Sequence, residues 1–499
     1  MLKHASHAGG VDFKTEIQFR TRFDYMFPVH ARSPDCLLPA ELATLDALLL
    51  LGTAMTDPGV QGAPVDPFDS DIPAGFTYLG QFIDHDITAR TDRELFESRI
   101  AELDGTPRAA KPVDPDAVVA GLANGRRPHL DLDSVYGDGP GLITGVNTTA
   151  RVLYDADLKL RIEPTMGKFD LPRDPETGMA VIADMRNDEN VIISQLHAAF
   201  LAFGNAVADG LGGALAREAR YSRARQFTRW AYQAVVINDY LPTVCDPAVV
   251  ADILMNGPRF FAPMVDGQQL FMPLEFSVAG FRFGHSMIRP AYQLNTGTDM
   301  PIEDLFNVKD LAATNTPARL PANLLIEWDN FVGTSAQPAR RIDAKLSAGL
   351  FVLPFGPNVF ARLAQRNLLR GYMLSIPTGQ AIAHAMGIEP LKDQLLAGED
   401  PDVEEAFRKG CFHDRTPLWY YVLKEADQQK DGQSLGAVGS RIVAETLIGL
   451  IKHDPNGVFG AHDSAVTIDD DGLVTVEVPA MGGTAVTEFA DMLEVAGVL

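Results

Sequence analysis

The amino-acid sequence predicts a mainly α protein with few short strands. Several long segments place apolar residues three or four positions apart, which is the period of an amphipathic helix. Only one pair of segments, near the C-terminus, shows a clear strand pattern. With 46% hydrophobic and 22% charged residues, the 499-residue chain can bury a large core.

The clearest helix is predicted over residues 189–209, where Ile192, Leu196 and Phe203 repeat at helical spacing. A second helix is predicted to begin near Ser222 and to end before Pro242, because proline does not continue a helix. Apolar periodicity predicts further helices at residues 39–55, 322–333, 357–374, 378–387, 400–409 and 436–453.

The strand pattern lies at residues 465–468 and 473–478, which flank Asp469–Gly472 as a hairpin. The Pro-, Gly- and Asp-rich stretches at residues 57–75 and 106–128 are interpreted as ordered loops, because dense apolar segments lie on both sides of each. The sequence shows no repeat and no low-complexity tract.

Charge and composition exclude several classes of protein. The formal net charge is −24 and the pI is about 4.8, which argues against a nucleic-acid or anionic-membrane partner. No run of eighteen apolar residues occurs, so we expect no membrane span.

The three cysteines, Cys36, Cys245 and Cys411, are too few and too scattered for a disulfide framework. The first ten residues lack the apolar centre of a secretory signal, so we expect the chain to be cytoplasmic or exported by a signal-less route.

Four short polar clusters can carry chemistry. In the first, residues 80–86, His85 stands between Asp84 and Asp86. A histidine so placed can be held in one tautomer as a proton carrier, or can begin a metal site. Taken alone, an ordinary hydrogen-bonded histidine with two solvated aspartates is the simpler interpretation.

The other three clusters also have simpler interpretations. Residues 184–189 are acidic and precede the first predicted helix, as in a helix cap. Residues 281–290 contain His285, either a core histidine or an axial ligand to a flat apolar cofactor whose carboxylates meet the neighbouring arginines. Residues 367–371 could be a helix interior with an amide facing a neighbour.

In order and spacing, the four clusters resemble the animal heme peroxidase family of the peroxidase–cyclooxygenase superfamily, which has bacterial members and includes myeloperoxidase. The family's Gly-Gln-x-x-Asp-His-Asp and Asp-x-Arg-x-x-Glu motifs are matched by residues 80–86 and 184–189. Its Arg-Tyr-Gly-His and Asn-x-x-Arg-Gly motifs are matched by residues 282–285, with phenylalanine in place of tyrosine, and by residues 367–371.

The resemblance implies a heme peroxidase domain at residues 31–455, built around a buried heme b. Residues 1–30 would be an N-terminal extension, and residues 456–499 a hairpin and tail packed on the domain. It also implies an oxidoreductase that reduces hydrogen peroxide through a ferryl intermediate and oxidises small donors such as phenols, halides or pseudohalides. The sequence leaves the oligomeric state open.

The resemblance assigns the distal side to His85, which would move the peroxide proton, and to Arg186, which would stabilise charge on the breaking O–O bond. Gln81 would lie at the distal water and halide position. On the proximal side, His285 would ligate the heme iron while Asn367 holds the other ring nitrogen.

The resemblance also implies how the heme is held. Arg282 and Arg370 would pair with the two propionates. Asp84 and Glu189 match carboxylates that form ester links to heme methyl groups in the animal enzymes. Asn190 stands where myeloperoxidase has a methionine, so its sulfonium link is not expected.

Calcium is a further implication of the resemblance. Asp86, Asp131 and Asp133 match ligand positions, and His129 would contribute its backbone carbonyl. Arg127, however, occupies the position of the family's threonine and cannot ligate a cation through its side chain. A solvated turn is the alternative interpretation.

Three alternatives remain open. A fatty-acid dioxygenase of the superfamily would need a tyrosine where this chain has Arg282. A catalytically silent binding or matrix relative would have no reason to keep His85, Arg186 and His285 together. A carboxylate-bridged metal hydrolase would need a second histidine pair near the first cluster, where the sequence has none.

Overall fold

The computed structural model describes residues 21–56, 68–89, 110–137, 139–140, 152–261, 270–350, 362–398, 400–470 and 472–499. The prediction of a mainly α protein is confirmed, because helices dominate these residues and the strands are short. In the described part of the chain, the strands form two three-stranded and three two-stranded sheets.

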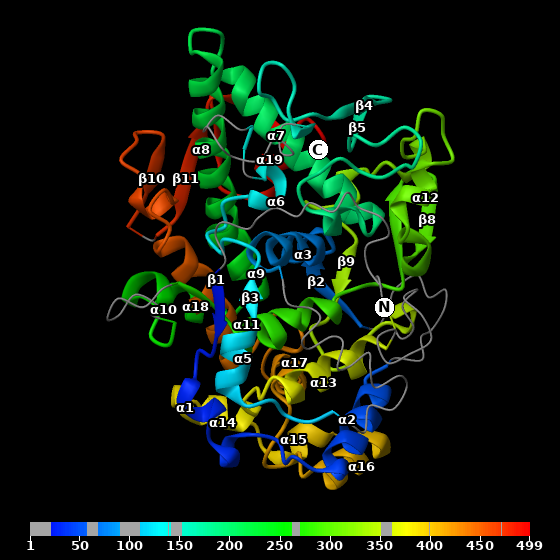
Figure 1. Cartoon of the computed structure of the whole chain (residues 1–499), viewed down its shortest axis with the longest axis vertical. Coiled ribbons are helices and arrows are strands. Elements are labelled where there is room, and N and C mark those ends of the chain that lie inside the picture. Colours follow the sequence, from blue (N-terminus) through cyan, green and yellow to red (C-terminus); the bar gives the residue numbers. More distant parts are fainter. Residues whose placement is uncertain are drawn as a thin grey trace.

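Helix α3 (Gly75–Ile87) lies in the middle of the molecule (Figure 1). It packs against α7 (Val191–Gly210), the 3-10 helices η4 (Met185–Asp188) and η7 (Gly280–His285), and the π-helical turn η5 (Val236–Tyr240). Three of the four polar clusters lie on or beside α3, η4 and η7. The fold therefore brings together clusters that lie about one to two hundred residues apart in the sequence.

The fourth cluster lies on α13 (Leu363–Met373). This helix packs against α2 (Leu42–Ala54) and α17 (Leu418–Lys430), and α17 in turn packs against η7. Together with α16 (Pro401–Gly410), α2 and α13 form the lower end of the molecule in Figure 1. The helix α17 thus links the third and fourth clusters.

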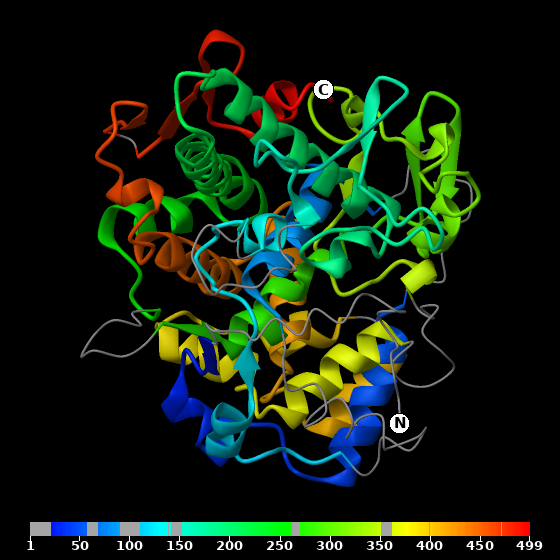
Figure 2. The same cartoon turned by 45° about the horizontal axis from the view of Figure 1, so that its top comes forward.

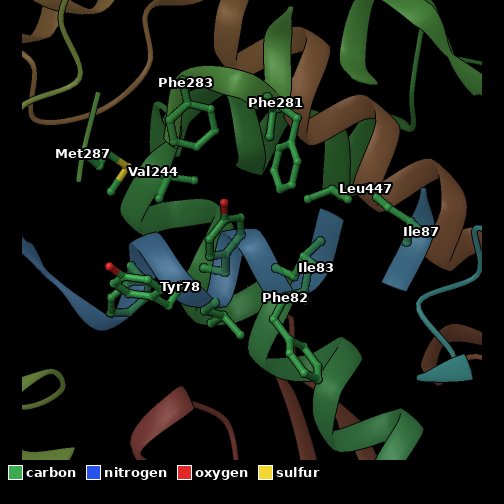
Figure 3. Close-up of a cluster of buried hydrophobic side chains, with 14 of the residues drawn as sticks. Tyr78, Phe82, Ile83, Ile87, Val244, Phe281, Phe283, Met287 and Leu447 are labelled. Carbon is green, nitrogen blue, oxygen red and sulfur yellow. The ribbon is translucent and has the colours of Figure 1, made fainter. Parts of the chain in front are cut away.

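Buried apolar side chains fix the position of α3. Phe82 and Ile83 lie in one apolar cluster with Phe281 of η7 (Figure 3), and all three are buried. Gly80 faces η5, because a Cβ atom at this position would lie 2.5 Å from the hydroxyl oxygen of Tyr240. Only glycine permits this close approach of η5 to α3.

Most predicted helices are observed within a few residues of the expected bounds. The described residues of the predicted helix 357–374 form α13, and residues 357–361 lie outside the described residues. The other confirmed helices are α2, α7, α14 (Gly379–Met386), α16 and α18 (Ala437–Lys452).

The predicted helix at 322–333 is wrong. The segment forms only two short 3-10 turns, Ala322–Leu324 and Trp328–Asn330. The side-chain amide of Asn295 donates to the carbonyls of residues 323 and 325, and the Glu327 N–H donates to the carbonyl of Leu294. These bonds take the backbone groups that a continuous helix would need.

The second predicted helix begins earlier and ends later than expected. Helix α8 runs from Arg217 to Val235, and η5 and α9 (Leu241–Val244) continue it past Pro242. The first turn of α8 is polar and therefore has no apolar periodicity. Pro242 is tolerated because it stands in the first turn of α9, where its missing N–H is not required.

The expected C-terminal hairpin is observed as β10 (Val466–Ile468) and β11 (Val474–Val478), and β12 (Thr484–Val486) adds a third antiparallel strand. This sheet lies beside α8 (Figure 2), and the following helix α19 (Phe489–Val495) packs on α7. The division of the chain at residues 30 and 455 stays a prediction.

Within the described residues, α7 is the one helix long and apolar enough to cross a membrane. In this fold 89% of its most apolar window is buried inside the molecule, as in the core helix of a globular protein.

The remaining elements are short. The other α-helices are α1 (Pro28–Ala31), α5 (Pro115–Gly121), α6 (Asp133–Tyr136), α10 (Pro247–Asn256), α11 (Leu274–Val278), α12 (Val308–Ala312) and α15 (Asp393–Ala397). The other strands are β1 (Thr21–Asp24), β2 (Asp69–Pro73), β3 (Ala123–Asn124), β4 (Glu163–Thr165), β5 (Lys168–Asp170), β6 (Phe271–Pro273), β7 (Ala291–Asn295), β8 (Thr298–Pro301) and β9 (Pro338–Arg340).

Candidate active site

Helix α3 presents Gln81, Asp84 and His85 on one face, because their spacing of three and four residues follows the helical turn, and Thr88 is the extended residue that ends the helix. His85 is 5% exposed, and its Nδ1 lies 2.7 Å from the Oδ1 of Asn187 on η4. An amide oxygen only accepts, so Nδ1 carries the ring proton and Nε2 keeps a lone pair.

The electrostatic surroundings keep His85 neutral. Burial is the main cause that lowers the pKa of His85, and the nearby Arg186 guanidinium lowers it further. The carboxylates of Glu189 and Asp184 act in the opposite direction but do not outweigh these effects. Its Nε2 lies 3.9 Å from the Oε1 of Glu189. A neutral imidazole with a bare Nε2 is the form that can accept a proton.

Arg186 is held on the same side by the start of η4. The Asp184 carboxylate accepts the Arg186 backbone N–H and binds its side chain through Nε and Nη2. Nη2 also donates to the carbonyls of His85 (2.8 Å) and Thr88 (2.7 Å) at the end of α3. Burial opposes the charged form, but Asp184 raises the pKa of Arg186, so the guanidinium stays charged. The described residues provide no hydrogen-bond partner for Nη1, which leaves it available to a ligand.

Gln81 and Glu189 complete the distal group. Gln81 donates from Nε2 to the Glu189 carboxylate and accepts from Asn190 Nδ2 at 3.4 Å. Asn190 also caps α7, because its Oδ1 accepts the Ile193 N–H at 2.9 Å. The simpler interpretation of residues 184–189 as the cap of this helix is therefore wrong: Asp184 caps η4, and Asn190 caps α7.

The proximal candidate, His285, ends η7. Its Nδ1 lies 2.9 Å from the Nδ2 of Asn367 on α13, and the edge of the Trp419 ring faces its ring at 6.4 Å between centroids. The Oδ1 of Asn367 is buried without a hydrogen-bond partner in the part of the chain that the structure describes. A half-turn of this amide exchanges Nδ2 and Oδ1, after which Oδ1 accepts from Nδ1–H and the histidine Nε2 is bare for a metal.

Three arginines act electrostatically on His285. Burial is the main cause that lowers the pKa of His285, and Arg282, Arg366 and Arg370 lower it further. Arg366 was not among the residues predicted for the site, although it stands one helical turn before Arg370 and therefore on the same face of α13. Three guanidinium groups beside one imidazole are suited to bind a ligand that carries carboxylates.

The residues present fit a haem. A Cβ atom at Gly284, next to His285, or at Gly371, next to Arg370, would meet no heavy atom of the described residues within 4 Å. Open space thus adjoins a histidine that can ligate iron and arginines that can bind propionates. On the distal side, His85 and Arg186 each keep one nitrogen available.

Comparison with known proteins agrees with this site. The family model for animal haem peroxidases matches residues 107–393, which is more than half of the chain. The chain belongs to the animal haem peroxidase family. A peroxidase-like protein of Margaritifera margaritifera is 24% identical over 343 residues, which is 59% of this chain and 41% of that protein. The chain thus spans less than half the length of this relative.

Solved structures of the superfamily share the fold of this chain. Peroxidase A of Dictyostelium discoideum has a TM-score of 0.59 at 15% identity and covers 88% of both chains. The fatty acid alpha-dioxygenase of Oryza sativa has a TM-score of 0.56 at 17% identity, covering 87% of this chain and 74% of its own. The fatty acid alpha-dioxygenase of Arabidopsis thaliana has a TM-score of 0.57 at 16% identity, and the match covers 84% of this chain and 71% of the dioxygenase chain. At these identities the likeness concerns the fold.

Asp86 ties the loop before α6 directly to α3. Its carboxylate accepts the Leu132 N–H at 3.1 Å, and the N–H and hydroxyl of Ser134 at 3.3 and 2.9 Å. Burial and the neighbouring Asp131 raise the pKa of Asp86 to about 6. Hydrogen bonds therefore connect this loop to α3.

Arginines occupy the surroundings of the other predicted calcium ligands. Asp131 Oδ2 lies 3.2 Å from Arg229 and 3.4 Å from Arg127, and Asp133 lies 3.3 Å from Arg126. The carbonyl of His129 accepts from a side-chain amide of α8 at 3.1 Å. Within the described residues, no group of three or more His, Cys, Asp or Glu side chains could hold a metal ion. In this arrangement the donor set does not fit calcium.

Gly204 allows α7 to pack closely on α6. A Cβ atom at Gly204 would lie 2.6 Å from the Tyr136 hydroxyl, so this packing leaves no room for a side chain at position 204. Asn205 accepts from the N–H of Leu160 at 2.9 Å and donates to its carbonyl at 2.7 Å.

Proposed function

We propose that this protein is a hydrogen-peroxide-dependent haem peroxidase that oxidises small donors such as phenols or halides. One observation carries the proposal. His85, with its proton fixed on Nδ1, and Arg186, with Nη1 available, belong to elements that pack together with η7, which carries His285. Family membership supports a haem-dependent oxidoreductase.

When bound, haem b would supply an iron that takes two oxidising equivalents from peroxide and passes them to donors. His285 would hold it through Nε2, and Arg282, Arg366 and Arg370 would bind its propionates. Asn367, as acceptor from the histidine Nδ1–H, would orient the ring without the full charge of a carboxylate partner.

The distal residues would move the proton. His85 would take the proton of the bound peroxide at Nε2 and return it to the departing oxygen. Arg186 would donate from Nη1 to the oxygen on which negative charge develops, a contribution of ~3 kcal/mol for one well-placed donor. Gln81 and Glu189 would line the same space, because their side chains are hydrogen-bonded to each other.

The proposal is tested by the absorption spectrum of the haem-loaded protein before and after stoichiometric hydrogen peroxide. We expect a ferric Soret band that shifts with peroxide and returns when a phenol or bromide is added. The absence of a Soret band with haem supplied, or a band that ignores peroxide, would overturn the proposal.

Covalent attachment is part of the proposal, because both expected carboxylates lie in the distal group. Asp84 accepts from the Thr88 hydroxyl at 3.0 Å, and Glu189 accepts from Gln81. We expect haem to stay with the wild-type chain in acidified organic solvent, and the double variant Asp84→Ala, Glu189→Ala to release it. Release from the wild type would show that no ester link forms.

Calcium is not part of the proposal. The resemblance implies the ion, but Asp131 and Asp133 pair with arginines and Asp86 accepts backbone N–H groups.

A fatty acid alpha-dioxygenase is the second candidate, since two solved structures of this fold carry that name. Such an enzyme would consume oxygen with a fatty acid and without added peroxide. Arg282, in the position of the oxygenases' tyrosine, argues against this chemistry. Oxygen uptake with palmitic acid, measured on the haem-loaded protein, distinguishes the two activities.

A further inference from the structure

A buried row of three polar side chains begins at His85. The Nδ1 of His85 is 2.7 Å from the Oδ1 of Asn187, and the Nδ2 of Asn187 is 2.9 Å from the Nδ1 of His197. The three side chains come from α3, η4 and α7, and their residues are 5%, 0% and 0% exposed. Three separate elements thus meet at one amide.

The amide determines the tautomer of both histidines. Its oxygen can only accept, so His85 must carry its proton on Nδ1. Its nitrogen can only donate, so His197 must keep Nδ1 bare and carry its proton on Nε2. Because the two ends of the amide are different, the orientation of Asn187 and the two tautomers specify one another.

The row ends at His197. Its Nε2 is buried and has no hydrogen-bond partner among the described residues, which costs free energy in the folded protein. Burial lowers the pKa of His197 to about 3, so the ring is neutral at physiological pH. The row therefore provides no hydrogen-bonded route for protons beyond His197.

Asn187 also follows Arg186 directly in η4. Arg186 binds the backbone carbonyl of His85 at 2.8 Å while Asn187 binds its ring, so two consecutive residues fix the main chain and the side chain of the same histidine. A shift of η4 would disturb both contacts together.

We propose that Asn187, itself oriented by His197, is a positioning residue that holds His85 in the tautomer whose Nε2 is free to accept a proton. This inference rests on the proposed peroxidase function only for its effect on rate. The tautomers of the two histidines are a property of this chain and can be measured without turnover.

The test uses full-length, haem-loaded protein labelled with nitrogen-15 at histidine and reduced under carbon monoxide, which is a diamagnetic form. Nitrogen NMR distinguishes protonated from bare ring nitrogens, and His85→Gln and His197→Phe variants assign the signals. We expect Nδ1 of His85 protonated and Nδ1 of His197 bare. The mirror pattern, with Nε2 of His85 protonated, would overturn the inference.

Two substitutions separate positioning from structural support. Asn187→Asp keeps an acceptor for His85 but has no donor for His197. We therefore expect His85 to keep its tautomer while His197 moves its proton to Nδ1. Asn187→Leu removes both partners, so we expect mixed His85 tautomers and a rate constant for the reaction with peroxide that is ~10 to 100 times lower. Asn187→Asp should retain most of the wild-type rate constant for the reaction with peroxide.

Asn205→Leu is the matched control, because this asparagine binds only the backbone of Leu160. It should leave the His85 signals unchanged. If Asn187→Leu does not fold, the test rests on Asn187→Asp alone. The inference then stands if the His197 proton moves to Nδ1 in that variant, and it fails if the proton stays on Nε2. A wild-type chain that ignores peroxide would overturn the proposed function and leave the tautomer test intact. If the wild type and Asn187→Leu react with peroxide at the same rate, the positioning role of Asn187 is overturned and the proposed function is retained.

Discussion

Replacing His285 with alanine is expected to abolish tight haem binding. Iron in this site would have one fixed protein ligand, the imidazole of His285 at the end of η7, whose ring is bound by Asn367. Without this imidazole, the three arginines would hold only the edge of the haem. We expect the affinity for haem to fall by more than ~100-fold, a larger loss than removal of an outer-shell partner causes. Titration of the purified variant with haem, followed at the Soret band, measures this loss.

His413→Ala is the matched control for this loss. His413 is a partly exposed histidine whose Nε2 lies 3.5 Å from Glu404, and it should bind haem as the wild type does. A His285→Ala protein with a normal Soret band and wild-type affinity would contradict the axial assignment. Near-identical circular dichroism of the two variants would show that lost binding is not lost folding.

The chemistry of the site could be predicted from sequence because it depends on residue types in short motifs. His85, Arg186 and His285 each stand in a motif, and the structure places their elements in contact through α3. The hydrogen-bond partners of these residues could not be predicted in this way. Asn187 contacts His85, and His197 contacts Asn187, only after three elements have packed, and nothing in their local sequence indicates these contacts.

The secondary structure likewise divides into parts that the local sequence indicates and parts that tertiary contacts decide. Helix α3 was not among the predicted helices, although its apolar residues have the period of a helix and Phe82 and Ile83 are buried along it. The signal was therefore present. At 322–333 the apolar pattern was misleading, because Asn295 and Leu294 of strand β7 take backbone groups of that segment. Tertiary hydrogen bonds of this kind override a local pattern.

The arginine-rich surroundings of Asp131 show why a matched motif does not guarantee a matched ion. The sequence shows Arg127 next to the loop, but Arg229 comes from α8, about a hundred residues away. Charge balance at a buried carboxylate is a property of every element packed against it. A motif records only the residues on one of those elements.

Replacing His85 with alanine is expected to leave haem binding intact and to slow the reaction with peroxide by ~10²-fold or more, the usual scale for lost general acid–base catalysis. The reason is geometric: Nε2 of His85 is the bare nitrogen of a ring whose other nitrogen is held by Asn187. Stopped-flow measurement of the Soret change at increasing peroxide gives the rate constant. Asn205→Leu again serves as the unaffected control.

The pH profile adds a second readout for His85. Burial, followed by Arg186, lowers the pKa of this histidine, so its neutral form persists below the usual value of ~6.5. As pH falls, the wild-type rate constant should therefore stay constant through ~6.5 and decline only in more acidic solution, where the ring is protonated. The alanine variant should lack that decline.

An unchanged rate in His85→Ala would mean that another group moves the proton. The neighbouring candidate, in protein whose Glu189 carboxylate has formed no ester link, is Glu189, whose Oε1 lies 3.9 Å from the Nε2 of His85 and whose side chain is 33% exposed. Glu189→Gln then distinguishes the two assignments, because it retains the hydrogen-bonding shape and removes the basic carboxylate. If His85 is the base, the glutamine variant should keep a wild-type rate constant within a few-fold, and the double variant should be no slower than His85→Ala. Loss of rate in Glu189→Gln alone would transfer the role of base from the histidine to the carboxylate.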